Sequence, residues 1–249
     1  LFFFLASDHR FVCSPLFLTF LDSFKRWQCN CPRLGKQYWW KKTNDEKTKE
    51  AYREFLTSAF TNGLSHAHPD THVFCWNDPN GIGLIQNIYT SLSLESRRVC
   101  LWIKNNMNAT PNVAFNRAYE PCVYGTKWKP SLSTEFRNLH EVLDKEVWVG
   151  NRVLEDIIDL FDIWLAKRLS VGEYEHPTEK PPTLHEKPLK RCTKVWDTVL
   201  DLFGWSGSTL IACEQIKRRA VLMEHEPIFI DLIIKRYEQL TGNTARKLN

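Results

Sequence analysis

The sequence has few glycines and no apolar run of membrane-spanning length. Ten glycines occur among 249 residues, where an average usage of about 7% predicts about 17. The apolar run from Leu1 to Leu5 is too short to cross a bilayer. It also lacks the basic segment that precedes the apolar part of a signal peptide. The sequence therefore predicts neither a membrane segment nor a signal peptide.

Paired cysteine motifs are also missing. Among eight cysteines only Cys29 and Cys31 are close, and a C-x-C without a second pair or nearby histidines is a poor zinc signal. The histidines between 66 and 72 span a loop and a strand start, so we expect no metal site there. Three other cysteines lie in apolar runs, namely Cys75, Cys100 and Cys122. This position predicts buried free thiols, which fit a reducing cytoplasm.

Charge of either sign is not in large excess. The net charge is +4, the pI about 8.6, and 43% of the residues are hydrophobic. These values exclude wholesale disorder and predict one large folded domain. They are compatible with a polyanionic partner, although many proteins without one have the same balance.

The hydrophobic pattern alternates between strand-like and helix-like segments. Such alternation predicts an α/β fold with a mostly parallel sheet and helices on both faces. Ligands of such sheets lie beyond the carboxyl ends of the strands. The expected strands are 71–76, 99–103, 121–124, 198–202 and 220–223, and the expected helices are 46–60, 82–92, 151–168, 184–192, 208–217 and 227–240.

The stretch 197–213 carries the most informative pattern. A buried strand ends in Asp201, and a turn of small residues then opens a helix. Small residues let a ligand approach the backbone, and the helix start offers free N–H donors. A second strand ends about twenty residues later in Glu224, an acid placed to accept the hydroxyls of a ribose. A tight turn without a ligand is the alternative.

Three segments in this order resemble the permuted DNA amino-methyltransferases, in which the cofactor-binding half follows the catalytic half. They are His176–Pro181, the glycine motif Asp201–Ser208, and Glu224–Pro227 with Phe229 and Arg236–Tyr237. The resemblance implies a Rossmann-like S-adenosylmethionine-dependent methyltransferase fold. It implies cofactor contacts from Lys180, Asp201, Phe203, Gly204, Ser206, Gly207, Ser208 and Glu224.

The resemblance extends back to about residue 44. It divides the chain into an atypical segment 1–44 and a methyltransferase domain 45–249, with a catalytic half at 45–150 and a cofactor half at 172–249. It implies methyl transfer to an exocyclic amine of double-stranded DNA, with N6 of adenine favoured over N4 of cytosine. A remnant that binds DNA or cofactor without catalysis is the alternative. A restriction-modification role follows from the resemblance, and a homodimer is left open.

The catalytic motif of the family is not found. The Asp-Pro-Pro-Tyr-type sequence that holds the target amine is expected after an apolar strand ahead of helix 46–60. Leu16–Thr19 is the candidate strand, yet Phe20–Ser23 follows it. Cys75–Pro79 is no replacement, because the resemblance places it on a different strand. We therefore assign no catalytic residue and expect a reading-frame change or truncation near residues 20–40.

Tryptophan stands at several positions where the family has glycine. An indole at Trp205 is expected to fill the methionine pocket, and Trp128 and Trp196 are further cases. Four more tryptophans lie in turn-like surroundings, and exchanging all seven would raise the glycine count from 10 to 17. We hypothesise that some of these tryptophans correspond to glycine codons that were translated with the wrong genetic code, and UGA is the candidate codon. Decay of the gene is the alternative. The four are Trp27, Trp39, Trp40 and Trp148, whereas Trp76, Trp102 and Trp164 fit strands or a helix.

Overall fold

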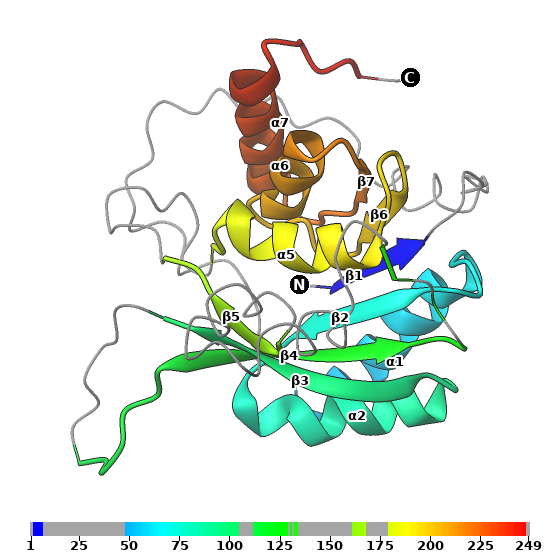
Figure 1. Cartoon of the computed structure of the whole chain (residues 1–249), viewed down its shortest axis with the longest axis vertical. Helices are drawn as coiled ribbons and strands as arrows, with labels where there is room; N and C mark the ends of the chain where they lie inside the picture. The colour runs from blue at the N-terminus through cyan, green and yellow to red at the C-terminus, as the bar shows by residue number, and fades with distance from the viewer. Residues whose placement is uncertain are drawn as a thin grey trace, which may run out of the picture.

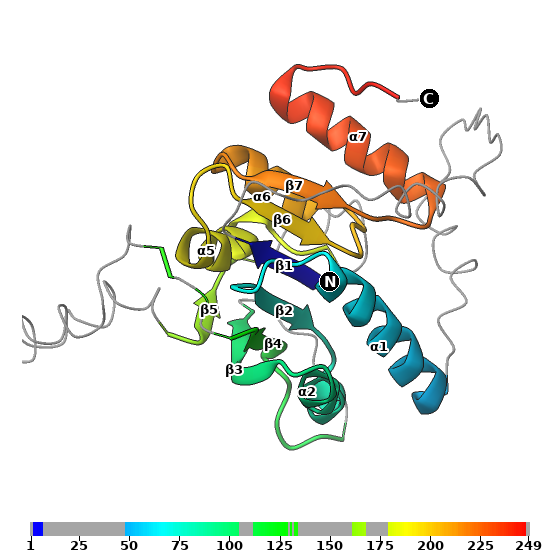
Figure 2. The ribbon, with the colours of Figure 1, turned by 90° about the vertical axis from the view of Figure 1, so that its right-hand side faces the viewer.

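A seven-stranded sheet with helices on both sides forms the body of the protein (Figures 1 and 2). The computed structural model describes residues 2–6 as backbone and, with their side chains, 48–104, 112–128, 130, 132–133, 161–167 and 179–247. The strands are β1 (Phe2–Ala6), β2 (His72–Trp76), β3 (Glu95–Ile103), β4 (Tyr119–Thr126), β5 (Ile163–Leu165), β6 (Thr198–Asp201) and β7 (Arg219–Leu222). The helices are α1 (Lys49–Ser65), α2 (Ile82–Ser91), α5 (Pro182–Cys192), α6 (Ser208–Gln215) and α7 (Pro227–Thr241), with a 3-10 turn η3 (Pro79–Gly81).

The strands are ordered β5-β3-β4-β2-β1-β6-β7 across the sheet. β6 pairs parallel with β7, and β3 pairs parallel with β5. β4 runs antiparallel to β2 and β3, and β1 runs antiparallel to β2 and β6. Strands β2, β3, β5, β6 and β7 therefore share one direction, and their carboxyl ends lie at one edge. This arrangement confirms the expected Rossmann-like α/β fold.

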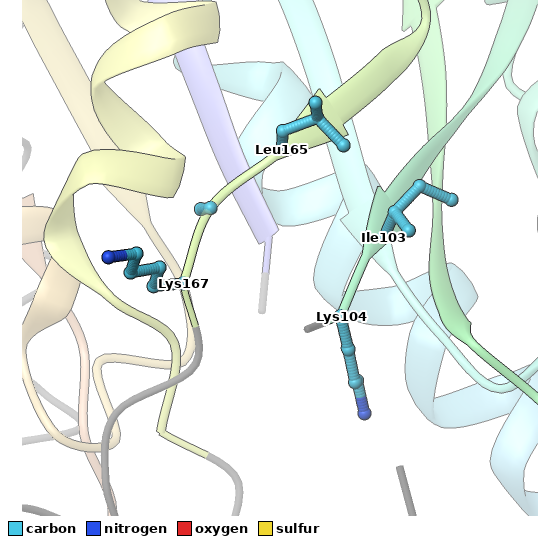
Figure 3. A pocket seen from close by; sticks show the side chains of 5 residues that line it. Ile103, Lys104, Leu165 and Lys167 are labelled. Carbon is cyan, nitrogen blue, oxygen red and sulfur yellow. The ribbon is translucent and has the colours of Figure 1, made fainter. Parts of the chain in front are cut away.

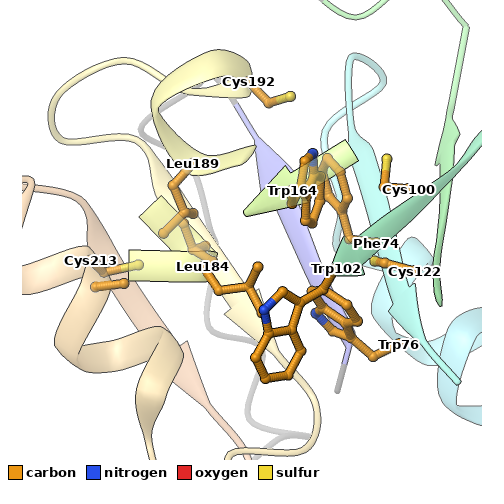
Figure 4. Packing of buried hydrophobic residues seen from close by; sticks show 12 residues of the cluster. Phe74, Trp76, Cys100, Trp102, Cys122, Trp164, Leu184, Leu189, Cys192 and Cys213 are labelled. Carbon is orange, nitrogen blue, oxygen red and sulfur yellow. The ribbon is translucent and has the colours of Figure 1, made fainter. Parts of the chain in front are cut away.

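Side chains alternate between two cores because successive residues of a strand point to opposite faces. From β2, Val73 and Cys75 join a cluster with α1 and α2, while Phe74 and Trp76 join one with α5 and α6. Figure 4 shows the second cluster, in which Trp76 and Trp164 make an edge-to-face contact with ring centroids 5.6 Å apart. Helices thus cover both faces of the sheet, as the alternating pattern predicts.

Local signals fix the ends of several elements. The Thr48 hydroxyl caps α1 by accepting the Ala51 N–H at 3.2 Å. α7 begins at Pro227 and ends before Gly242, whose φ of 71° gives the left-handed cap that glycine favours. The expected buried free thiols are also confirmed, and two further cysteines of the described residues share that state: Cys75, Cys100, Cys122, Cys192 and Cys213 are all buried and free.

Two parts of the fold differ from the sequence prediction. The helix expected at 151–168 is wrong at its end, because Ile163–Leu165 forms β5 and residues 151–160 lie outside the described residues. Pairing with β3 and burial of Trp164 override the helical spacing there. β1 at Phe2–Ala6 was not expected as a strand, and the candidate strand Leu16–Thr19 lies outside the described residues.

Candidate cofactor site

The turn between β6 and α6 lies at the carboxyl edge of the sheet and packs closely on α7. The Gly207 N–H donates to the Gly204 carbonyl at 2.7 Å, and Gly207 precedes α6 with a φ of 76°. A Cβ on Gly207 would lie 3.0 Å from Ile233 of α7, and one on Gly204 would lie 3.1 Å from the same side chain. A side chain at either position would therefore press against Ile233, so the turn packs closely on α7.

Asp201 closes β6 as a fully buried carboxyl group. Its Oδ1 accepts the Phe203 N–H at 3.0 Å, and its Oδ2 is a buried oxygen with the Thr209 hydroxyl beside it. Burial raises the pKa of Asp201 to about 7 and the nearby Glu224 carboxylate adds to the rise, whereas the Thr209 hydroxyl and the Phe203 N–H lower it.

Glu224 follows β7 and joins the two strand ends. Its Oε2 accepts the Trp205 N–H at 2.7 Å. Its Oε1 accepts the N–H groups of His225 at 2.8 Å and Glu226 at 2.9 Å. A carboxylate has about four acceptor positions, so capacity for one further donor is left. The strands that end in Asp201 and Glu224 are neighbours in the sheet, as expected.

A buried ion pair holds the turn from the other side. Arg236 of α7 donates from Nη1 to the Ser206 carbonyl at 2.6 Å and pairs with Glu179 Oε1, also at 2.6 Å. The Glu179 side chain is 2% exposed and the Arg236 side chain is 15% exposed. Sequence reasoning did not select either residue, although both stand inside the motifs that carry the resemblance.

Lys180 is placed differently from the other expected cofactor residues. Its Nζ lies 3.1 Å from Glu120 Oε2 of β4 and 5.2 Å from the centre of the Trp76 ring. Lys104 pairs with the same carboxylate. Burial opposes ionisation of Glu120, but the two lysines hold its pKa below the usual value. In this structure Lys180 therefore contacts β2 and β4 and not the turn after β6.

Aromatic side chains and hydroxyls complete the surroundings of the turn. Ser206 and Ser208 are buried with their hydroxyl oxygens 3.1 Å apart. Phe203 points to α1, where its ring contacts Phe55 with centroids 5.7 Å apart. The Trp205 ring stacks on Phe229 of α7 at 6.0 Å. Of the expected cofactor residues, the turn brings together all but Lys180.

A hollow of about 320 Å³ lies at the carboxyl edge of the sheet, where β3 and β5 end. Its lining is apolar apart from two lysines, which Figure 3 shows extending from the ends of the two strands. Within the described residues no group of histidines, cysteines or carboxylates is arranged to hold a metal ion. In that same part of the chain, the helices are too short or too polar to cross a membrane. The hollow is lined by Ile103, Lys104, Leu165, Ala166 and Lys167.

The turn has the features that S-adenosylmethionine would need. Free N–H groups at the start of α6 and the spare acceptor position on Glu224 match the amino acid and ribose parts of that molecule. The small residues give the ligand access to the backbone. The indole of Trp205 is the one group at the turn that does not fit.

Comparison with known proteins shows which family the chain resembles. A family model described as DNA methylase matches residues 22–235, a range that begins inside the segment 1–44. The type II methyltransferase M2.DpnII of Streptococcus pneumoniae is 27% identical over 172 residues, which cover 64% of this chain and 61% of that protein. M.HinfI of Haemophilus influenzae is 26% identical over 180 residues, covering 65% and 46%. The chain thus spans less than two thirds of these relatives.

Solved structures share the fold. The M1.HpyAVI–SAM complex superposes with a TM-score of 0.59 at 20% identity, covering 74% of this chain and 82% of that one. TTHA0409 of Thermus thermophilus, a putative DNA modification methylase complexed with S-adenosyl-L-methionine, gives a TM-score of 0.55 at 20% identity, covering 78% and 80%. PvuII DNA methyltransferase, which is cytosine-N4-specific, gives 0.54 at 12% identity, covering 80% and 78%.

Proposed function

Because the chain belongs to the DNA methylase family, we propose that it is the body of an enzyme that transfers a methyl group from S-adenosylmethionine to an exocyclic amine in DNA. N6 of adenine is the favoured acceptor, and N4 of cytosine is the alternative. The observation that carries the proposal is the hydrogen bond between the Trp205 amide and Glu224. It joins the glycine turn to the acid of the next strand at the ligand-binding edge of the sheet.

The residues around the turn have distinct tasks in this proposal. Glu224 accepts from a ribose hydroxyl with its spare acceptor position, while its other bonds keep the turn in place. The first amides of α6 and the small residues Gly204, Ser206, Gly207 and Ser208 hold the methionine part. The ion pair of Arg236 with Glu179 fixes the Ser206 carbonyl. When bound, S-adenosylmethionine supplies an electrophilic methyl group, so the protein's main task is to align the amine with it.

The target base has to leave the duplex to reach this edge, because a stacked base cannot approach the methyl group in line. Contacts to phosphates would hold the DNA without reading its sequence. Lys127, after β4, is a candidate for such a contact. Lys129 and Arg137 are further candidates that lie outside the described residues. The buried free thiols support a reducing compartment such as the cytoplasm.

A binding remnant without catalysis is the second candidate. Trp205, whose ring stacks on Phe229 at the turn, supports it, because an indole at this position is expected to fill the methionine pocket. The absence of an Asp-Pro-Pro-Tyr-type sequence supports it as well. Both features belong to the present amino-acid sequence, and each can be reversed by substitution.

The test is methyl transfer from tritiated S-adenosylmethionine to duplex DNA. We expect no methyl incorporation with the unchanged protein or with W205G. Incorporation is expected only when W205G also carries an Asp-Pro-Pro-Tyr-type motif restored after Leu16–Thr19. Hydrolysis of the DNA and mass spectrometry then identify the product, expected to be N6-methyladenine. A restored protein that binds the cofactor but modifies no DNA would contradict the enzyme proposal. Activity of W205G without the motif would show that another group holds the amine.

A further inference from the structure

The tryptophans of the described residues fall into two classes. Trp76, Trp102 and Trp164 lie in strands and are 6%, 2% and 4% exposed. The other three have left-handed backbones, with φ of 57°, 71° and 49°, and within the described part of the chain they make up half of the six non-glycine residues with positive φ. These three are Trp128, Trp196 and Trp205.

A left-handed backbone is costly for a residue with a large side chain. The Cβ atom approaches the carbonyl oxygen, which costs roughly 1–2 kcal/mol, and only glycine escapes this penalty. Asparagine and aspartate tolerate the conformation through local hydrogen bonds, which an indole cannot make. Nothing in the side chain of tryptophan therefore explains its repeated use at such positions.

Two of these positions are defined by turns that call for glycine. The Asp197 N–H donates to the Lys194 carbonyl at 3.1 Å, which makes Trp196 the third residue of a four-residue turn. In the same way the bond from Gly207 to Gly204 makes Trp205 the second residue of its turn. A positive φ at either position is characteristic of turn types in which glycine dominates.

Packing does not require an indole at two of these positions. Trp128 is 65% exposed and Trp196 is 54% exposed. A shared binding surface does not explain them either, because Trp196 precedes β6 and Trp205 follows it, at opposite ends of that strand. The property that the three positions share is the left-handed backbone conformation.

We infer that positions 128, 196 and 205 are glycine positions, encoded by UGA, and that the organism reads this codon as glycine. Tryptophan in strands is then encoded by UGG. This inference rests on the proposed function only where it concerns the cofactor. With glycine at 205, the indole is removed from the turn while the backbone N–H that donates to Glu224 is kept.

The nucleotide sequence is the first test. We expect UGA codons at 128, 196 and 205, and UGG codons at 76, 102 and 164. A UGG codon at any of the first three positions would overturn the inference, and so would UGA at the three strand positions.

Melting temperatures test the backbone argument without any ligand. W196G is expected to melt roughly 2–4 °C above W196A, because about 1 kcal/mol of left-handed strain is relieved only by glycine. W128G and W128A are expected to differ in the same direction. Val195 is the matched control, since it is exposed in the same turn and its φ is not positive. At this control position V195A is expected to melt at a higher temperature than V195G. If the glycine variants at both 128 and 196 melt at or below the temperature of the alanine variants, the inference is overturned.

Calorimetry with S-adenosylmethionine separates this inference from the proposed function. We expect W205G to bind at least tenfold more tightly than the printed chain. UGA codons together with no binding by W205G would leave the glycine assignment in place and contradict the cofactor site. Equal binding by both proteins would show that the indole does not block the turn, and would overturn its role at position 205.

Discussion

The Trp205 amide donates a 2.7 Å hydrogen bond to Glu224 Oε2. The bond joins the loop after β6 to the residue that follows β7, so two neighbouring strand ends are held in one geometry. Because the donor is a backbone group, the contact does not depend on the side chain at position 205. Glu224 therefore has a structural task in addition to the one proposed for it in cofactor binding.

E224Q is predicted to weaken both tasks. The substitution removes the negative charge that three N–H groups share, and it turns an acceptor into a donor that faces them. We expect a loss of about 1–3 kcal/mol in the free energy of unfolding and at least a tenfold loss of S-adenosylmethionine affinity in the W205G background. Urea unfolding and calorimetry are the measurements. E214Q, at an exposed position of α6, is the control and should change neither.

Asp201 is predicted to make stability depend on pH. Burial raises its pKa from the ordinary 3.8 to about 7, so the folded protein keeps a proton that the unfolded chain releases. The free energy of unfolding therefore falls as pH rises from about 4 to about 7, and the loss is complete above pH 7. In D201N this contribution is absent.

The comparison of D201N with the unchanged protein isolates this effect. His185, whose pKa burial lowers to about 3, contributes in the opposite direction over part of the same range, but equally in both proteins. We expect the stability of D201N relative to the unchanged protein to increase from pH 4 to pH 7, by on the order of a few kcal/mol. A difference that stays constant across this range would show that Asp201 is ionised throughout.

Glu179 and Arg236 are predicted to be coupled in their contributions to the free energy of unfolding. E179Q leaves the guanidinium with a neutral partner in a buried place, which we expect to cost about 3 kcal/mol. The double variant E179Q/R236M should lose less than the sum of the two single variants. E186Q is the control, because it breaks the more exposed pair with Lys190 and should cost less than about 1 kcal/mol. Additive losses in the double variant would mean that the two side chains act independently.

Two glycine-to-alanine substitutions are predicted to change the free energy of unfolding in opposite directions. G207A places a Cβ 3.0 Å from Ile233 on a backbone with φ of 76°, so we expect a loss of about 1–3 kcal/mol. G83A adds a methyl group in open space on helix α2, so a gain of about 0.5–1 kcal/mol is expected. Thermal unfolding of the two variants tests both. A stabilising G207A would contradict the close packing of the turn on α7.

Local patterns predicted the elements whose signals are contained in a short stretch of chain. The run 198–202 with its following acid and small residues led to β6, the turn and α6, and Gly242 marked the end of α7. Long-range pairing was not predictable in this way. Trp164 lies in a strand because β3 is available beside it, and Lys180 faces Glu120 because β4 lies across the sheet from α5. The inner place of β1 likewise depends on two partners far along the chain.

The direction of β1 affects how the protein can be produced and labelled. Phe3 pairs with Asp201 and Phe2 pairs with Cys75, so the strand enters the sheet at the carboxyl edge. Any residues attached before Phe2, such as an affinity tag, would leave the sheet beside the cofactor turn and compete with ligands for that space. A tag placed after α7 would follow Gly242 instead, where the chain runs clear of the sheet (Figure 1). Binding measurements are therefore best made with carboxyl-terminal tags.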